Sequence, residues 1–158
     1  LRDFDLFNSI LDEIKTKKIN IEINVVILKS YIQFLNNKDI VNIYYNISDE
    51  MLRALYQKSM CLFIPLKDAT ACNSILESLA CGTPVVSTNV GDNIDYLNSK
   101  CSIFIEGNNK DQLLEAILYI MNNNINQKMR IAAREQSLNF DWEVISRKLD
   151  SFYREVLN

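Results

Sequence analysis

The sequence predicts an α/β fold, an open and doubly wound parallel sheet with helices on both of its faces. Short apolar runs of strand length alternate along the chain with amphipathic segments of helical period. Such alternation is typical of parallel sheets, because successive parallel strands are joined by crossover helices. The chain has 158 residues, of which 48% are hydrophobic and 23% charged. This is the size and composition of one globular domain, so we expect a single domain over residues 1–158.

The first third of the chain contains two predicted helices and two predicted strands. Phe4, Phe7 and Ile10 begin an apolar series at helical spacing that ends near three lysines, at 15, 17 and 18. Strands are expected at 21–28 and 40–45, with one helical turn at 31–36 between them. Ser48 is the expected N-cap of a second helix. The apolar face of that helix consists of Met51, Leu52, Leu55 and Tyr56.

Residues 61–91 are the centre of the predicted architecture. The apolar run 61–64 ends at Pro65 and predicts a strand buried on both faces. After the polar loop 67–73, residues 74–81 predict a helix, and Gly82 stands where a left-handed C-cap residue is favoured. Val85 to Ser87 is the next predicted strand. The apolar side of the helix is formed by Ile75, Leu76, Leu79 and Ala80.

The last third of the chain is predicted to be mostly helical. A short helix at 91–97 and a strand at 102–105 precede a helix capped by Asn108 or Asn109. A polar break is expected at 122–126, followed by a further helix to about residue 138. The final helix starts near Asp141 and is expected to bury Trp142, Ile145, Leu149, Phe152 and Val156.

The loop 67–73 is the predicted ligand site. In a parallel sheet such a loop lies at the carboxyl end of the strands, where backbone N–H groups of the following helix bind anions. Thr70, Asn73 and Ser74 supply small polar groups there. Glu77 lies about one turn inside the helix, within reach of a sugar hydroxyl beside a bound phosphate. The structural alternatives are a helix cap for Asn73 and Ser74 and a solvated helix face for Glu77.

Charge and composition restrict the other functions. A net charge of −3 gives no general reason to bind nucleic acid or anionic membrane. No apolar run approaches the roughly 20 residues that span a bilayer, and no signal peptide is visible. The absence of histidine removes the commonest general base and metal ligand, and no metal site is predicted. The four cysteines have no metal-like spacing, which favours free thiols in a reducing, cytoplasmic compartment; they are Cys61, Cys72, Cys81 and Cys101.

The segment ILESLACGTPVVSTNVG resembles the donor-site signature of family 4 glycosyltransferases, which have the two-domain GT-B architecture. The family pattern is a Glu, seven residues, a second Glu, and a small-residue helix ending in Gly-x-Pro-Val-Val. The second Glu matches Glu77, whereas the first falls on Ala69, beside Asp68. The Asp-Ala-Thr-Ala-x-Asn run resembles a subset of the family that lacks the first Glu. The likeness continues to the C-terminus.

This resemblance implies a Rossmann-like donor-binding domain, the C-terminal half of a GT-B fold. In the family, the residue at Glu77 accepts hydrogen bonds from the ribose, and amides at the helix start contact the donor phosphates. Arg2 lies near the position of a family lysine that neutralises the diphosphate, and Ile47 near the main chain that recognises the base. The residues expected to bind the donor are therefore Glu77, Asn73, Ser74, Thr70, Cys72, Asp68, Arg2 and Ile47.

Two parts of the family architecture are expected to lie outside this sequence. Family domains begin with a strand ending in Gly-Arg, and the chain opens with a segment that resembles the one just after it. Loss of this first strand would leave two half-sheets with exposed edges, unless the fragment rearranges, another segment fills the gap, or the strand belongs to residues outside this sequence. The acceptor-binding N-terminal domain is also missing. The final helix, 141–157, is expected to pack toward it, and any peripheral membrane association would come through it.

The leading hypothesis is transfer of a hexose from a nucleoside diphosphate sugar to an acceptor hydroxyl with retention, without metal or cofactor. The chain alone is expected to bind the donor and not to catalyse transfer. An alternative, favoured by Ala69, is a non-catalytic nucleotide-binding or protein-interaction module of the same fold. A nucleotide-sugar epimerase or a phosphorylase is a third possibility, against which the lack of histidine and of a cofactor lysine signature weighs.

Overall fold

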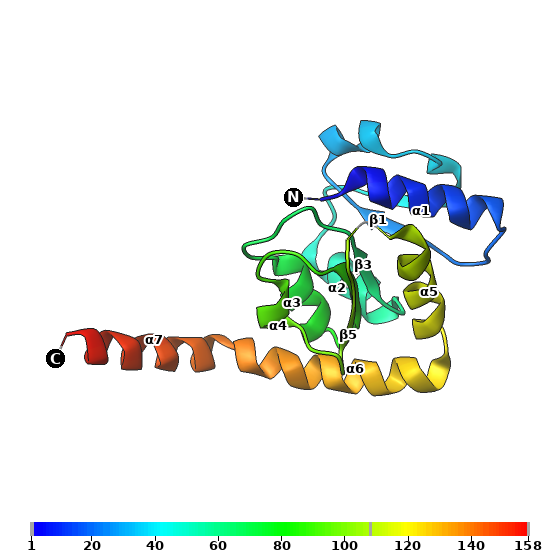
Figure 1. The fold of residues 1–158 in the computed structure, drawn as a ribbon. Helices are drawn as coiled ribbons and strands as arrows, with labels where there is room; N and C mark the ends of the chain where they lie inside the picture. Colours follow the sequence, from blue (N-terminus) through cyan, green and yellow to red (C-terminus); the bar gives the residue numbers. More distant parts are fainter. Residues whose placement is uncertain (1, 108, 158) are drawn as a thin grey trace.

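A computed structural model describes residues 2–107 and 109–157 of the chain (Figure 1). Helices and strands alternate through the first two thirds, and helices form the last third. In chain order the elements are α1 (Phe4–Thr16), β1 (Asn24–Val26), the 3-10 helices η1 (Lys29–Phe34) and η2 (Lys38–Ile40), β2 (Asn42–Tyr44), α2 (Asp49–Lys58), β3 (Leu62–Ile64), α3 (Asn73–Ala80), β4 (Val85–Thr88), α4 (Asn93–Tyr96), β5 (Ser102–Ile105), α5 (Lys110–Ile120), α6 (Asn123–Ser137), η3 (Leu138–Phe140) and α7 (Trp142–Val156).

The strands form two parallel sheets. One has the order β1-β2 and the other β3-β4-β5, and every neighbouring pair is parallel. No strand within the described residues joins β1 to β3, so the prediction of two half-sheets agrees with the structure. The two halves nevertheless share one core, because Ile23 beside β1 and Phe63 of β3 pack against the same buried cluster.

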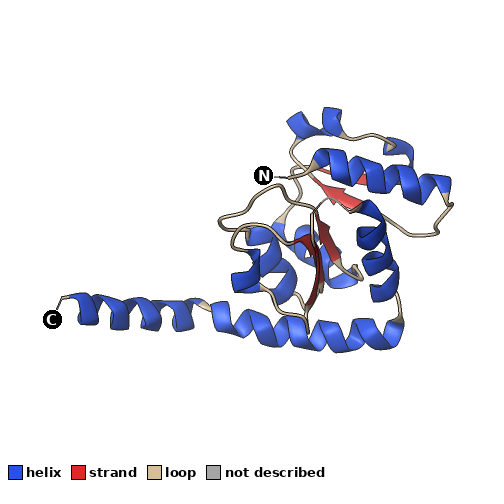
Figure 2. Cartoon of the chain, in the orientation of Figure 1, coloured by secondary structure: helices blue, strands red, loops and turns tan. Residues whose placement is uncertain are grey.

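Helices cover both faces of the larger sheet (Figure 2), which confirms the predicted α/β class. Strand β4 is fully buried, and its adjacent residues Val85 and Val86 point to opposite faces. Val86 packs into a cluster with α1 and α5, whereas Val85 packs with α3 and Ala133 of α6. Helix α2 lies beside α3. The sheet is therefore the middle of three layers.

The strands nearest the division between the sheets are shorter and more exposed than predicted. β1 covers 24–26 instead of 21–28, and β2 covers 42–44 instead of 40–45. Leu62 and Phe63 of β3 are only partly buried, so the prediction of burial on both faces is wrong for this strand. The physical reason is that β1 and β3 each have a neighbouring strand on one side only.

The predicted helix starts are mostly confirmed. The side chains of Ser48, Asn109 and Asp141 each accept a backbone N–H at the start of a helix, while Asn108 lies outside the described residues. Gly82 has φ of +68°, as a left-handed C-cap requires. The predicted polar break between two helices is present, but it is shorter than 122–126, because α5 ends at Ile120 and α6 already begins at Asn123. The Asn122 side chain accepts the N–H of Asn124, so this polar stretch caps and begins α6.

Helix α7 buries none of its residues, contrary to the prediction. Figure 1 shows it running away from the rest of the molecule, and its contacts are mainly with η3. Trp142 is 84% exposed, and Leu149 47%. The predicted amphipathic pattern is present, but no described residue covers its apolar side. Phe152 and Val156 are also exposed, and Ile145 is partly buried.

A buried hydroxyl and amide cluster, Ser87, Thr88 and Asn93, joins the carboxyl ends of β3 and β4. The Thr88 hydroxyl accepts the Leu66 N–H at 2.9 Å and donates to the Leu66 carbonyl at 2.7 Å. The Ser87 hydroxyl donates to the Ile64 carbonyl, and the Asn93 amide donates to Ser87. All three side chains are at most 1% exposed. Here side chains replace the ladder hydrogen bonds where the strands diverge.

Thr88→Val tests the contribution of this cluster. Valine keeps the shape of threonine but leaves the N–H and carbonyl of Leu66 without their partner. We expect a loss of about 1–3 kcal/mol in the free energy of unfolding, measured by urea denaturation. Thr16→Val, at the exposed end of α1, is the control and should change stability little. Equal effects of the two substitutions would contradict the assignment.

Leucine-to-alanine substitutions test the burial pattern of the last third. In the 158-residue chain, Leu149→Ala on α7 should cost less than about 0.5 kcal/mol, because its side chain already faces solvent. Leu113→Ala on α5, where the side chain is 0% exposed, should cost about 2–5 kcal/mol. A large loss with Leu149→Ala would mean that α7 packs against the domain.

Candidate functional site

The candidate site is the loop between β3 and α3 together with the first turn of α3. Hydrogen bonds from the end of β4 and from the β4–α4 turn hold this loop in place. The Asp92 N–H donates to the Ala69 carbonyl at 2.9 Å, and Leu66 is held by Thr88. A Cβ on Gly91 would lie 1.9 Å from the Ala69 carbonyl oxygen, so only glycine allows this approach. The loop position thus depends on backbone contacts with the next strand's turn.

Ala69 occupies the position where the family pattern has its first Glu, and its side chain packs against the core under the loop. The neighbouring carboxylate, Asp68, is exposed and accepts its own neighbour's N–H, that of Ala69, at 2.8 Å. The carboxylate of Asp68 therefore lies on the solvent side of the loop, whereas the residue at the pattern position faces inward.

The N-terminus of α3 presents unpaired backbone donors. Cys72 is the N-cap and makes no side-chain capping bond, and its carbonyl accepts the N–H groups of Ile75 and Leu76. Among the described residues, none accepts the N–H groups of Asn73 or Ser74. The alternative reading of Asn73 and Ser74 as a helix cap does not hold, because both residues lie within the first turn of α3. The arrangement leaves two N–H groups and the positive end of the helix dipole available to an anion.

Arg2 reaches this helix start from the other end of the chain. Its guanidinium donates to the Ser74 hydroxyl at 3.1 Å and lies 3.4 Å from the Cys72 sulfur. Backbone pairing sets its position, because Arg2 forms an antiparallel bridge with Leu66 and the Asp3 N–H donates to the Pro65 carbonyl. Arg2 and Ser74, which the sequence analysis predicted separately as donor-binding residues, are thus in direct contact.

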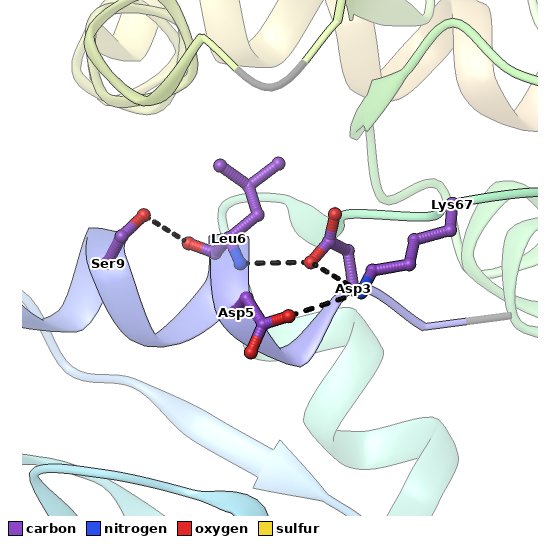
Figure 3. Close-up of a pocket in the computed structure, with 5 residues that line it drawn as sticks. All are labelled: Asp3, Asp5, Leu6, Ser9 and Lys67. Atoms are coloured by element: carbon purple, nitrogen blue, oxygen red, sulfur yellow. Dashed lines mark hydrogen bonds and ion pairs between the residues drawn. The ribbon is translucent and has the colours of Figure 1, made fainter.

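A polar hollow of about 250 Å³ beside this segment shows how the N-terminus is fixed (Figure 3). The buried Asp3 carboxylate caps α1 by accepting the Leu6 N–H at 3.0 Å. The Lys67 ammonium lies 3.2 Å from Asp5 and 3.8 Å from Asp3. The hydrogen bond to Asp5 and the charges of both carboxylates raise the pKa of Lys67. Lys67 therefore links the loop to α1 and is already paired with carboxylates.

Among the described residues, the hydrogen-bond partner of Glu77 is Tyr56, which the sequence analysis assigned to the apolar face of the helix that is now α2. The Tyr56 hydroxyl donates to the Glu77 carboxylate at 3.1 Å. Burial of the ring, followed by the negative charge of Glu77, raises the pKa of Tyr56. The only signal that could have found this pair is the general tendency of a half-buried tyrosine to place its hydroxyl on a polar partner.

The remaining predicted residues are less closely tied to this cluster. Thr70 and Asn73 are exposed in the loop and at the start of α3. Ile47 follows β2, immediately before the N-cap of α2, and is partly buried. The structure therefore brings Arg2 into direct contact with Cys72 and Ser74, and it places Glu77 one turn further along α3 with Tyr56 as its hydrogen-bond donor.

The cysteines are free, as predicted. Cys72 and Cys101 are buried, and burial raises the pKa of Cys61 to about 12, so that thiol stays protonated. Within the described ranges, no group of three or more histidine, cysteine or carboxylate side chains could hold a metal ion. The same residues contain no helix long and apolar enough to cross a membrane.

The fold and this loop place the chain among α/β domains that present a helix N-terminus at the carboxyl edge of a parallel sheet. The family model described as "Glycosyl transferases group 1" matches residues 24–137. The chain belongs to this glycosyltransferase family. The match includes the whole candidate site except Arg2.

A curated relative is the D-inositol 3-phosphate glycosyltransferase of Corynebacterium diphtheriae. It is 27% identical over 109 residues, which cover 68% of this chain and 26% of that protein. Two solved structures share the fold over nearly the whole chain. A glycosyltransferase from Rickettsia africae ESF-5 has a TM-score of 0.81 at 23% identity, covering 98% of this chain and 44% of its own. Sucrose-phosphate synthase from Thermosynechococcus elongatus has a TM-score of 0.76 at 20% identity, covering 99% and 44%.

The chain thus spans about a quarter of the length of that curated relative and less than half of each solved chain. The structural matches establish the GT-B glycosyltransferase fold of this domain, whereas the family model establishes membership.

A pair of glycine substitutions tests the loop support. Both Gly91→Ala and Gly107→Ala place a Cβ on a residue with positive φ, of +54° and +63°, which costs about 1–2 kcal/mol. Only Gly91→Ala also meets the Ala69 carbonyl, whereas nothing lies within 4 Å of a Cβ on Gly107. We expect Gly91→Ala to lose more stability in urea, by at least about 1 kcal/mol. Indistinguishable losses would show that the loop moves freely.

Proposed function

We propose that this chain is the donor-binding domain of a retaining, family 4-type glycosyltransferase that moves a hexose from a nucleoside diphosphate sugar to an acceptor hydroxyl. The observation that carries the proposal is the N-terminus of α3, where Arg2 binds the Ser74 hydroxyl beside two unpaired N–H groups, with the Glu77 carboxylate exposed on the next turn of the same helix. Membership of the glycosyltransferase family supports the same reaction class.

The proposed chemistry is electrostatic. The N–H groups of Asn73 and Ser74 and the Arg2 guanidinium would stabilise the diphosphate, on which negative charge grows as the sugar–phosphate bond breaks. Glu77 would accept hydrogen bonds from the ribose hydroxyls. Thr70, Cys72 and Asp68 would border the sugar and phosphates, and main chain near Ile47 would border the base. This machinery needs no metal or other cofactor.

We further propose that the acceptor is bound by a partner domain that closes over the loop 67–73. The chain covers less than half of each matching solved structure, and the apolar side of α7 is uncovered. That side would pack toward the partner domain, which would also carry any membrane association. The protein would act in the cytoplasm, and the domain alone would bind the donor without transferring the sugar.

A non-catalytic nucleotide-binding or interaction module is the second candidate, and one observation favours it. At the first Glu position of the family pattern, Ala69 packs its side chain into the core. The exposed carboxylate of Asp68 would then have to hold the sugar hydroxyls in a catalytic protein.

Nucleotide binding tests the proposal. Thermal unfolding of the purified protein is measured with UDP, ADP and GDP and with the corresponding diphosphate sugars. At about 100 times its dissociation constant, a specific ligand should add roughly 2.7 kcal/mol of stability. Glu77→Gln removes the charge that would accept the ribose hydroxyls, and it should cost about 1.5–3 kcal/mol of that binding.

Glu115→Gln, an exposed residue on α5, is the matched control and should bind as the wild type does. If the folded protein binds none of these nucleotides, the donor-binding proposal is wrong and the interaction module gains support. If it binds one series but transfers no sugar in the presence of its partner domain, the non-catalytic nucleotide-binding module is favoured.

A further inference from the structure

The hydrogen bond between Tyr56 and Glu77 restrains a residue of the family pattern through a residue that lies outside that pattern. Glu77 is an exposed carboxylate on the second turn of α3, where a free glutamate samples several rotamers. In the described chain, the Tyr56 hydroxyl is the one hydrogen-bond donor to it, at 3.1 Å. The bond joins residues 21 apart in sequence, across the α2–α3 interface.

Tyr56 is itself held firmly. Its ring is largely removed from solvent between α2 and α3, and its carbonyl accepts the Thr83 hydroxyl at 2.6 Å. Thr83 is fully buried at the end of the α3–β4 turn. A tyrosine hydroxyl is protonated at physiological pH, and burial and the charge of Glu77 raise the pKa of Tyr56 further. The hydroxyl is therefore a fixed donor rather than an adaptable one.

The geometry leaves most of the Glu77 carboxylate free. Tyr56 occupies one position on Oε2, and no described residue donates to Oε1. A carboxylate has about four acceptor positions, so enough remain for two neighbouring hydroxyls on one sugar ring. Restraining the carboxylate before the ligand arrives lowers the entropy lost on binding.

The same tyrosine also connects the two ends of the proposed donor site. The Ser74 side chain acts on the Tyr56 hydroxyl and lowers its pKa, opposing the effects of burial and Glu77. Ser74 also accepts a hydrogen bond from Arg2. Tyr56 therefore interacts both with Ser74 at the helix start and with the Glu77 carboxylate one turn later.

We propose that Tyr56 is a positioning residue that holds the Glu77 carboxylate for a vicinal diol, and that it thereby makes the site selective for ribose over deoxyribose. This inference rests on the proposed function, because it assumes that a nucleoside diphosphate binds beside α3. Tyr56 itself would not touch the ligand, and the site would distinguish ribose from deoxyribose.

Tyr56→Phe tests the inference, with dissociation constants measured by calorimetry for UDP, ADP and GDP and for their 2′,3′-dideoxy counterparts. Loss of one hydrogen bond that orients Glu77 should weaken binding of the cognate ribonucleotide by about 3–10-fold. Binding of the dideoxy compound, which offers Glu77 no hydroxyl, should change by less than about twofold. A merely structural role for the hydroxyl would weaken both compounds equally.

Two further variants complete the design. In Glu77→Gln, the added Tyr56→Phe substitution should produce no further loss of ribonucleotide affinity, because the tyrosine acts through the carboxylate. Tyr119→Phe, which removes a hydroxyl from an exposed position on α5, controls for loss of a phenol as such.

The outcomes separate this inference from the proposal on which it rests. If the wild type prefers the ribonucleotide and Tyr56→Phe removes most of the preference, the inference stands. If the wild type binds a nucleotide and Tyr56→Phe has no effect, or affects both compounds equally, the inference is overturned and the donor-binding proposal remains. If the folded wild type binds no nucleotide, both are overturned.

Discussion

The buried cluster of Ser87, Thr88 and Asn93 is the constraint on which the rest of the site depends. A strand followed by a long polar loop has no local reason to hold that loop in one position. Here the Thr88 hydroxyl binds both backbone groups of Leu66, and the Asp92 N–H binds the carbonyl of Ala69. The loop is thereby held at two points, Leu66 and Ala69, before the chain enters α3. Since Thr88 and Leu66 are buried, their hydrogen bonds are protected from competition with water, and they fix the start of the loop that leads into α3.

The second constraint is the attachment of the N-terminal segment to the end of β3. The sheet is divided, and its halves share a core under α1 and α5. Backbone bonds from residues 2 and 3 to Leu66 and Pro65 hold the start of α1 against the larger sheet, and Asp3 caps that helix. These contacts stabilise the structure at the place where the sheet divides. They also position Arg2 beside the N-terminus of α3. One set of hydrogen bonds therefore serves both the fold and the candidate site.

The site departs from its family pattern in a physically specific way. The position of the first pattern Glu, Ala69, contributes to the core instead of to the ligand side, and the nearby carboxylate of Asp68 is turned to solvent. The second pattern Glu, Glu77, gains a tyrosine partner. The ribose side of the proposed site is thus more constrained by the protein than the sugar side. Under the proposed function, binding of the nucleotide and handling of the hexose would therefore be separable properties.

The sequence by itself determined the α/β class, the order of the elements and the place of the loop, because these depend on local signals. Apolar period, the caps at Ser48, Asn109 and Asp141, and Gly82 act within a few residues. Only the tertiary structure decided which residues meet. Arg2 and Ser74 are 72 positions apart, and Tyr56 and Glu77 are 21 apart, so neither pair leaves a periodic pattern in the chain. The same holds for burial: β4 and α7 both carry apolar residues, yet β4 is enclosed by two helical layers, whereas α7 contacts mainly η3 and buries none of its residues. A pattern of side chains specifies a face that can be buried, whereas burial itself requires a second surface from elsewhere in the chain.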